Sequence, residues 1–130
     1  MTDMAPSESQ VLLTHFDWNL RRLEEVIQQE QNDYFKGAAL QRFGHTYEIT
    51  IKVLRSFAKD HGVLCKTEEQ CFETAVTNGW LENIFDIKEL TNDYQRIIQK
   101  PQQNTENIYK KLVIYHKAFS CLLNQLKKAS

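Results

Sequence analysis

Residues 41–57 read QRFGHTYEITIKVLRSF, and they hold the clearest helical pattern in the chain. Apolar side chains recur through and around this stretch in steps of three or four, the spacing of one helix face: Leu40, Phe43, Tyr47, Ile51, Leu54 and Ala58. A polar row with the same spacing occupies a neighbouring face: Gln41, His45, Glu48 and Lys52. The stretch therefore predicts a long helix with a buried stripe beside a polar row.

The polar row has two interpretations. In the simpler one it is a solvated face on which Glu48 and Lys52 form an ion pair one turn apart. In the other it lines a groove between helices or between subunits, where Arg42 and Lys52 bind phosphate oxygens and Glu48 accepts a hydrogen bond or orients a cation. On this second interpretation, Arg42, His45, Glu48 and Lys52 are predicted to bind a nucleotide or another phosphorylated ligand.

The composition is that of one folded domain. The 130 residues include only four glycines and two prolines, which favours a few long helices over many short strands. The formal net charge of -1 argues against binding to nucleic acid through a general basic field. No apolar run approaches the ~20 residues that span a bilayer, and the first residues lack the pattern of a secretion signal. We therefore expect a cytoplasmic protein with no membrane partner, a flexible lead over 1–8 and a single domain over 9–130.

Breaks in the apolar pattern divide this domain into predicted helices. The first covers about 9–31 and the second about 34–61, with Gly62 placed for a left-handed cap. Thr67 and Gln70 have the spacing of a capping box, which begins a short third helix. Trp18 lies outside the apolar stripe of the first helix, so it either packs at a helix contact or is exposed at an interface.

The second half of the chain follows the same pattern. Asn78 and Gly79 end the third helix, and a fourth is predicted over 80–100, because the residue before Pro101 is driven out of helical geometry. The last helix begins at Asn104 or Thr105 and has an unbroken apolar stripe: Ile108, Leu112, Tyr115, Phe119, Leu122 and Leu126. The prediction is an all-α fold, an up-and-down four-helix bundle with one additional short helix.

The chain lacks the common motifs of catalysis and metal binding. It has no glycine-rich phosphate loop, no nucleophile elbow and no paired histidines at zinc spacing. Its three cysteines, Cys65, Cys71 and Cys121, are an odd number without CxxC spacing, so they are predicted to be free thiols and not a disulfide or a zinc site. We expect no metal, no cofactor and no catalytic residue.

Several segments, taken in order, resemble the nucleotidyltransferase substrate-binding protein family, which belongs to the HEPN superfamily of small helical bundles. The resemblance spans about 11–126 and is carried by these motifs: Gln41-Arg42-Phe43, Thr46-Tyr47-Glu48, Lys52-Val53-Leu54, Phe72-Glu73-Thr74-Ala75, Asn78-Gly79-Trp80-Leu81 and the helix from Ile108 to Leu123. It implies a bundle that forms a homodimer, or a heterotetramer with its partner. That partner is a separate minimal nucleotidyltransferase, which holds the metal-bound nucleotide while the bundle supplies a substrate-side surface.

Related HEPN bundles are toxins of toxin-antitoxin pairs, and they use an arginine, a histidine and a tyrosine on one helix. In this chain the corresponding positions are changed: Lys88 stands where the arginine is expected, Asp93 where the histidine is expected, and Tyr94 is one residue early. Loss of the arginine and histidine removes the groups that would bind phosphate and transfer protons. The resemblance therefore implies a non-catalytic accessory subunit, with a ribonuclease toxin that uses a degenerate motif as the alternative.

Overall fold

The protein is all-helical over the residues described by the computed structural model, which are 7–29, 32–100 and 105–129. Five helices follow one another along the chain: α1 (Glu8–Ile27), α2 (Asp33–Asp60), α3 (Glu68–Thr77), α4 (Ile87–Gln99) and α5 (Thr105–Ala129). The prediction of an all-α chain is confirmed. The predicted boundaries of the first two helices are close to those observed, although Gln31 lies outside the described residues.

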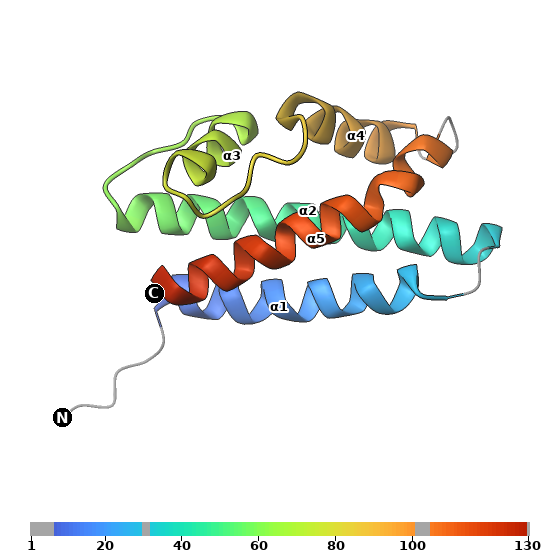
Figure 1. The fold of residues 1–130 in the computed structure, drawn as a ribbon, viewed down its shortest axis with the longest axis horizontal. Coiled ribbons are helices and arrows are strands. Elements are labelled where there is room, and N and C mark those ends of the chain that lie inside the picture. The colour runs from blue at the N-terminus through green and yellow to red at the C-terminus, as the bar shows by residue number, and fades with distance from the viewer. Residues whose placement is uncertain (1–6, 30–31, 101–104, 130) are drawn as a thin grey trace.

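The long helix α2 occupies the centre of the molecule. It packs along α1, which runs in the opposite direction, and α5 crosses both of them (Figure 1). The two shorter helices, α3 and α4, follow one another along the side of α2 that faces away from α1 (Figure 1). Because α2 contacts every other helix, its sequence decides how the remaining elements are placed.

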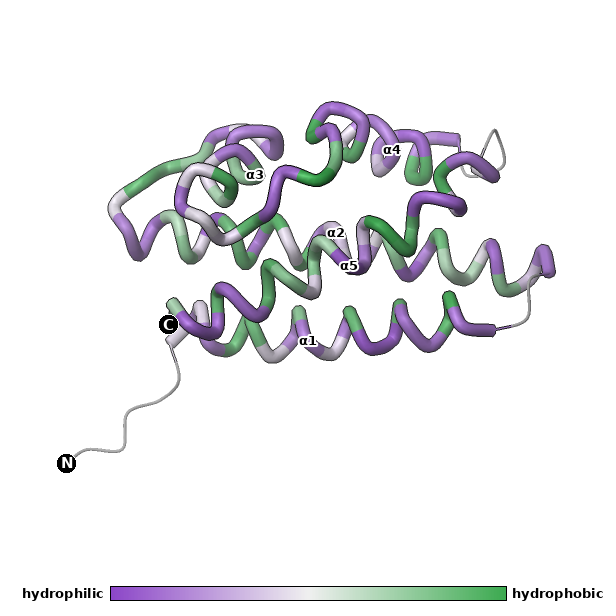
Figure 2. Tube along the Cα trace, in the orientation of Figure 1, coloured by the Kyte–Doolittle hydropathy of each residue, from purple (hydrophilic) through white to green (hydrophobic). Residues whose placement is uncertain are grey.

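The predicted stripes meet in one core. All six apolar residues predicted for α2 and all six predicted for α5 are buried, and hydrophobic residues turn toward the interior along the helices (Figure 2). Phe43 is fully buried, and its ring stacks with those of Tyr115 and Phe119 at centroid separations of 5.4 and 6.2 Å. On α1 the residues Leu13, Phe16, Leu20 and Leu23 are buried, whereas Ile27 at its end is only half-buried: the stripe reaches the edge of the core there.

The predicted caps of α2 and α3 are present. Gly62 has φ of +77° and follows α2, where the amide of Val63 donates to the carbonyl of Ala58, as in a left-handed helix end. Thr67 and Gln70 form the capping box of α3, and Gly79 follows that helix with φ of +76°. The cap of α5 was predicted at Asn104 or Thr105; Thr105 is the first residue of the helix, and Asn104 lies outside the described residues.

The fourth helix begins later than the sequence pattern suggests. Residues 80–86 are irregular, and α4 starts at Ile87 with Asp86 as its N-cap, the carboxylate accepting from the amides of Lys88 and Glu89. Trp80 packs against Phe57 and His61 at the end of α2 and does not belong to α4. The apolar spacing at Ile84 was misleading, because that side chain is 44 % exposed.

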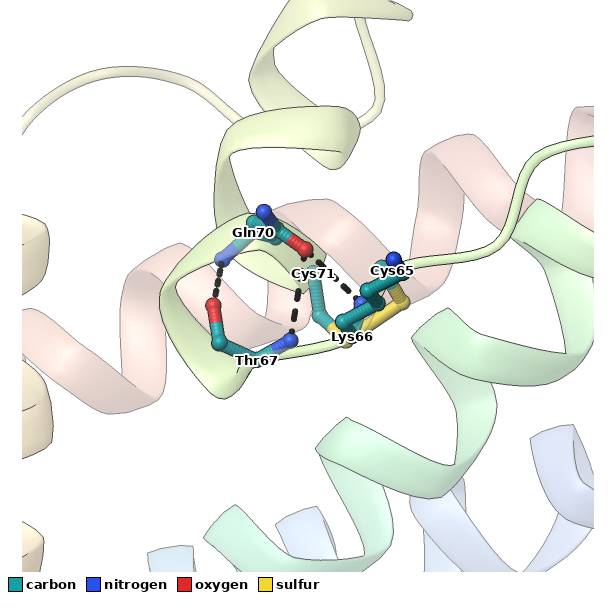
Figure 3. Close-up of a disulfide and its surroundings, with 5 residues drawn as sticks. All are labelled: Cys65, Lys66, Thr67, Gln70 and Cys71. Atoms are coloured by element: carbon teal, nitrogen blue, oxygen red, sulfur yellow. Dashed lines mark hydrogen bonds between the residues drawn. A yellow bond between two sulfur atoms is a disulfide. The ribbon is translucent and has the colours of Figure 1, made fainter.

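The prediction of free thiols was wrong for two of the three cysteines. Cys65 and Cys71 form a disulfide between the connection that precedes α3 and the first turn of that helix (Figure 3). Their Cα atoms are 5.2 Å apart, within the range that a disulfide requires. Gln70 lies beside this bond and accepts from the amides of Lys66 and Thr67, so the disulfide and the capping box fix the same turn (Figure 3). Cys121 is free and half-buried.

Within the described ranges, the chain has no helix whose length and apolar character would allow it to cross a bilayer.

Removal of the Cys65–Cys71 disulfide is predicted to destabilise the protein. The bond closes a short loop and so constrains the unfolded chain. Losing this constraint lowers the free energy of unfolding by about 2 kcal/mol. Denaturant unfolding of Cys71→Ser and of the reduced wild type should show this loss, with Cys121→Ser as the control. Identical unfolding midpoints for the oxidised wild type and Cys71→Ser would contradict it.

Candidate functional site

A groove of about 390 Å³ lies between α2, the C-terminal half of α4 and the first residue of α5. Its lining includes three of the four residues of the predicted polar row: Gln41, His45 and Glu48. Apolar walls come from Leu40, Ile97 and Ile98, and Thr105 lies at one end. The groove interpretation therefore fits these three polar residues, each of which is exposed to solvent.

Two glycines within α2 leave space in this groove. Gly37 and Gly44 lie seven residues apart on the same helix face, and both line the groove. A Cβ atom at Gly37 would have nothing within 4 Å, and one at Gly44 would meet only the Cγ2 atom of Ile97 at 4.0 Å. Neither position needs glycine for packing, although glycine within a helix costs about 1 kcal/mol relative to alanine. Because Gly37 and Gly44 have no side chains, the groove is wider. The same two glycines lower the stability of the helix.

Glu48 is positioned by a hydrogen bond from α4. The hydroxyl of Tyr94 donates to Oε2 of Glu48 over 2.8 Å. The ring of Tyr94 stacks on that of Tyr47, with centroids 4.0 Å apart and planes within 10° of each other. The hydroxyl of Tyr47 in turn donates to Oε1 of Glu68 over 2.7 Å. Two stacked tyrosines thereby hold two carboxylates, and one of these carboxylates faces the groove.

Burial and these hydrogen bonds suppress ionisation of the tyrosines. Burial first, and then the hydrogen bond to Glu68, raises the pKa of Tyr47 above its ordinary value. Burial and the hydrogen bond to Glu48 raise the pKa of Tyr94 in the same way. Both hydroxyls therefore remain donors at neutral pH, and Glu48 keeps its position in the groove wall.

The structure does not bring Arg42 and Lys52 into the groove with His45 and Glu48. The guanidinium of Arg42 lies over the ring of Trp18 at 5.5 Å from its centroid, on the side of α2 that packs against α1. Arg22 lies over the same indole at 5.4 Å, and Trp18 is 51 % exposed between them. Lys52 lines a separate hollow of about 260 Å³ toward α1. The predicted ion pair between Glu48 and Lys52 is replaced, among the described contacts, by the bond from Tyr94.

The positions of the degenerate motif do not form one site. Asp93 is 7 % exposed and accepts from the hydroxyl of Tyr115 over 2.6 Å, and it lies 2.7 Å from Nζ of Lys111. Lys88 is exposed, while Tyr94 points its hydroxyl at Glu48. Asp93 and Tyr94 therefore join α4 to α5 and to α2 respectively.

The Asp93 cluster also includes a second carboxylate. Nζ of Lys111 lies 2.6 Å from Oε1 of Glu89 as well as beside Asp93. Burial by itself would lower the pKa of the Lys111 ammonium, but its hydrogen bonds with Asp93 and Glu89 raise that pKa above the ordinary value. Burial and the bond to Asp93 raise the pKa of Tyr115. The cluster is fully paired, which is typical of a structural ion pair at a helix contact.

Sequence reasoning missed the other wall of the groove. Ile97 and Ile98 come from a helix whose start was misplaced, and no motif indicates that Gly37 and Gly44 border open space. The sequence did contain one indication of the groove. Two glycines on one face of a long helix lower its stability, so their presence suggests a packing or functional reason.

No protein-family model and no curated protein matches this chain. The described residues also contain no group of three or more histidine, cysteine, aspartate or glutamate side chains placed to hold a metal ion. The resemblance to the nucleotidyltransferase substrate-binding family therefore stays a prediction.

Gly44→Ala is predicted to stabilise the protein by about 0.5–1 kcal/mol, because alanine is the better helix former and the added methyl meets only ordinary contact. Denaturant unfolding would measure the change. The matched control is Gly62→Ala, which should destabilise, since Gly62 has a positive φ. A loss of stability in Gly44→Ala would contradict this account of the groove.

Stability is predicted to fall steeply at alkaline pH. The folded state raises the pKa of Tyr47, Tyr94 and Tyr115, so the unfolded chain loses these protons first. Their contribution to the free energy of unfolding is complete below the unfolded pKa near 10. It is lost as the pH rises above that value, by about 1.4 kcal/mol per pH unit for each tyrosine.

Denaturant unfolding measured from pH 8 to 11.5 checks this dependence. Tyr94→Phe should reduce the slope above pH 10, because one of the protons that the unfolded chain loses first is removed. A free energy of unfolding that stays level between pH 10 and 11.5 would contradict the assignment.

Proposed function

We propose that this chain is a non-catalytic, substrate-binding accessory subunit of a two-component minimal nucleotidyltransferase. The groove between α2 and α4 is its substrate-side surface. The observation that carries this proposal is the construction of the groove, in which Glu48 is held by Tyr94 and two glycines keep the floor open. The resemblance to the nucleotidyltransferase substrate-binding family covers nearly the whole chain. It indicates that the partner is a minimal nucleotidyltransferase.

The absence of a catalytic arrangement at the motif positions supports an accessory role. A general acid or base must reach the substrate, and a phosphate-binding cation must lie beside it. Asp93 is buried against Tyr115 and Lys111, and Lys88 is exposed on another part of α4. Asp93 contributes to the packing of α4, and the two residues offer no converging set of groups around one reacting atom.

The proposal also covers the bundle type and the oligomeric state of the chain. We place the chain in the four-helix-bundle, HEPN-type class, with the short helix α3 as the additional element. We also assign it a homodimeric state in the complex with the nucleotidyltransferase. The exposed Trp18 between Arg22 and Arg42 is suited to a subunit contact, because exposed tryptophan and arginine are enriched at the centres of interfaces.

Co-expression with a minimal nucleotidyltransferase encoded in the same genome tests the proposal. The two proteins should co-purify, and light scattering should give a defined stoichiometry with at least two copies of this chain. Trp18→Ala and Lys117→Ala, the second an exposed lysine on α5, separate an interface effect from a general surface effect.

Two outcomes would overturn the proposal. A monodisperse protein that binds no such partner would remove the accessory role. Cleavage of RNA by the purified wild type, lost in Lys88→Ala, would favour the toxin alternative instead.

A further inference from the structure

We propose that the ligand of this surface is a guanine nucleotide, with its base in the groove and its phosphate along α2 against Lys52 and Arg55. This inference rests on the proposed function for the role of the groove as a substrate surface. It adds the chemical class of the ligand and the direction in which that ligand lies.

The groove has the chemistry of a base-binding site. Leu40, Ile97 and Ile98 supply apolar surfaces for the faces of a flat ring, and the glycine floor leaves room for it. The polar lining consists of Gln41, His45 and Glu48 along α2, with Thr105 from α5. A concave site that combines apolar walls with a small number of polar groups is typical of small-ligand recognition.

Glu48 selects for hydrogen-bond donors on the base. A carboxylate only accepts hydrogen bonds, and its two oxygens have about four acceptor positions. The bond from Tyr94 uses one position on Oε2, which leaves both oxygens able to accept again. Guanine presents a ring N–H and an amino group side by side on one edge and can donate to both oxygens. Adenine and uracil lack that adjacent pair of donors.

A cationic strip on α2 begins one turn beyond Glu48, where it borders the separate hollow between α2 and α1. Lys52 follows Glu48 by one turn, about 6 Å along the helix axis. Lys52, Arg55 and Lys59 line the hollow of about 260 Å³ with Glu8, Leu12 and Ser56. The three cations are exposed, and within 7–29, 32–100 and 105–129 no carboxylate forms a salt bridge with any of them. Phosphate oxygens are the natural partners of such a strip, and arginine can bind them bidentately.

The order of the groups along α2 fixes the orientation. The groove residues occupy 37–48, and the cations occupy 52–59. The reverse orientation would place phosphate against Glu48 and leave the base against lysines, which repulsion and desolvation disfavour. The base therefore lies toward Gly44 and the phosphate toward the C-terminal end of α2.

Calorimetric titration of the full chain with GMP, AMP, UMP, guanosine and inorganic phosphate tests this assignment. GMP should bind about tenfold more tightly than AMP or UMP, the size of discrimination that a bidentate contact to a base gives. Guanosine should bind more weakly than GMP, and inorganic phosphate alone should bind most weakly, because it contacts only the strip.

Matched variants separate the two halves of the site. Glu48→Gln keeps an acceptor for Tyr94 but removes one acceptor oxygen, so GMP should fall to the affinity of AMP. Lys52→Ala with Arg55→Ala should weaken GMP at least fivefold and leave guanosine unchanged. Glu82→Gln and Lys117→Ala, both exposed and outside the site, should leave every affinity unchanged. Circular dichroism confirms that each variant is folded.

The nucleotide titration can succeed or fail independently of the co-purification that tests the accessory role. Equal binding of GMP, AMP and UMP, or unchanged GMP binding by Glu48→Gln, would overturn this inference even if the nucleotidyltransferase co-purifies. Phosphate binding as tight as GMP would also overturn it, because the strip alone would then be the site. Guanine-selective binding without any nucleotidyltransferase complex would support the inference and count against the accessory role.

Discussion

The stacked rings of Tyr47 and Tyr94 join α2 to α4, and the placement of the groove depends on this contact. Tyr47 belongs to the buried stripe of α2, while Tyr94 comes from the buried face of α4. Their rings lie 4.0 Å apart, and their hydroxyls are bound to Glu68 and Glu48. The same pair therefore sets the distance between the two helices, attaches the first turn of α3 and fixes a carboxylate in the groove wall.

The same kind of contact engages two of the motif positions on α4. In α4, Tyr94 is bound to α2 and Asp93 to α5, so these two polar groups are committed to helix contacts. Buried tyrosine hydroxyls require acceptors, and each of these tyrosines has a carboxylate. Within the proposed accessory role, the side of α4 that remains for a ligand is the apolar one, represented by Ile97 and Ile98. In the proposed role, this surface binds and presents a substrate.

Periodicity and capping residues were sufficient to predict most of the fold. The stripes of α2 and α5 and the capping box at Thr67 depend on local spacing, which a single sequence displays directly. The start of α4 was misplaced because Trp80 and Ile84 imitate helical spacing while Trp80 in fact packs onto α2. The Cys65–Cys71 disulfide was missed because its formation depends on how the chain turns before α3, which the spacing of cysteines does not reveal.

The site was predictable only in part, for a related reason. Gln41, His45 and Glu48 share a face, and the groove contains all three, since one helix fixes their relation. Arg42 was assigned to the same site but is directed to Trp18, because a step of one residue rotates a side chain by about 100° around the helix. The apolar wall from α4 required knowledge of helix packing. Knowledge of helix packing was also needed to identify the partner of Glu48, which is Tyr94 and not Lys52.

The backbone amides of the glycines report directly on whether a ligand binds in the groove between α2 and α4. The chain has four glycines, and two of them, Gly37 and Gly44, line the groove. The other two, Gly62 and Gly79, follow the ends of α2 and α3. In a proton–nitrogen NMR titration with GMP, the amide signals of Gly37 and Gly44 should shift and saturate together, while those of Gly62 and Gly79 stay unmoved. Shifts confined to Gly62 and Gly79, or no shift of Gly44 at saturation, would contradict binding in this groove.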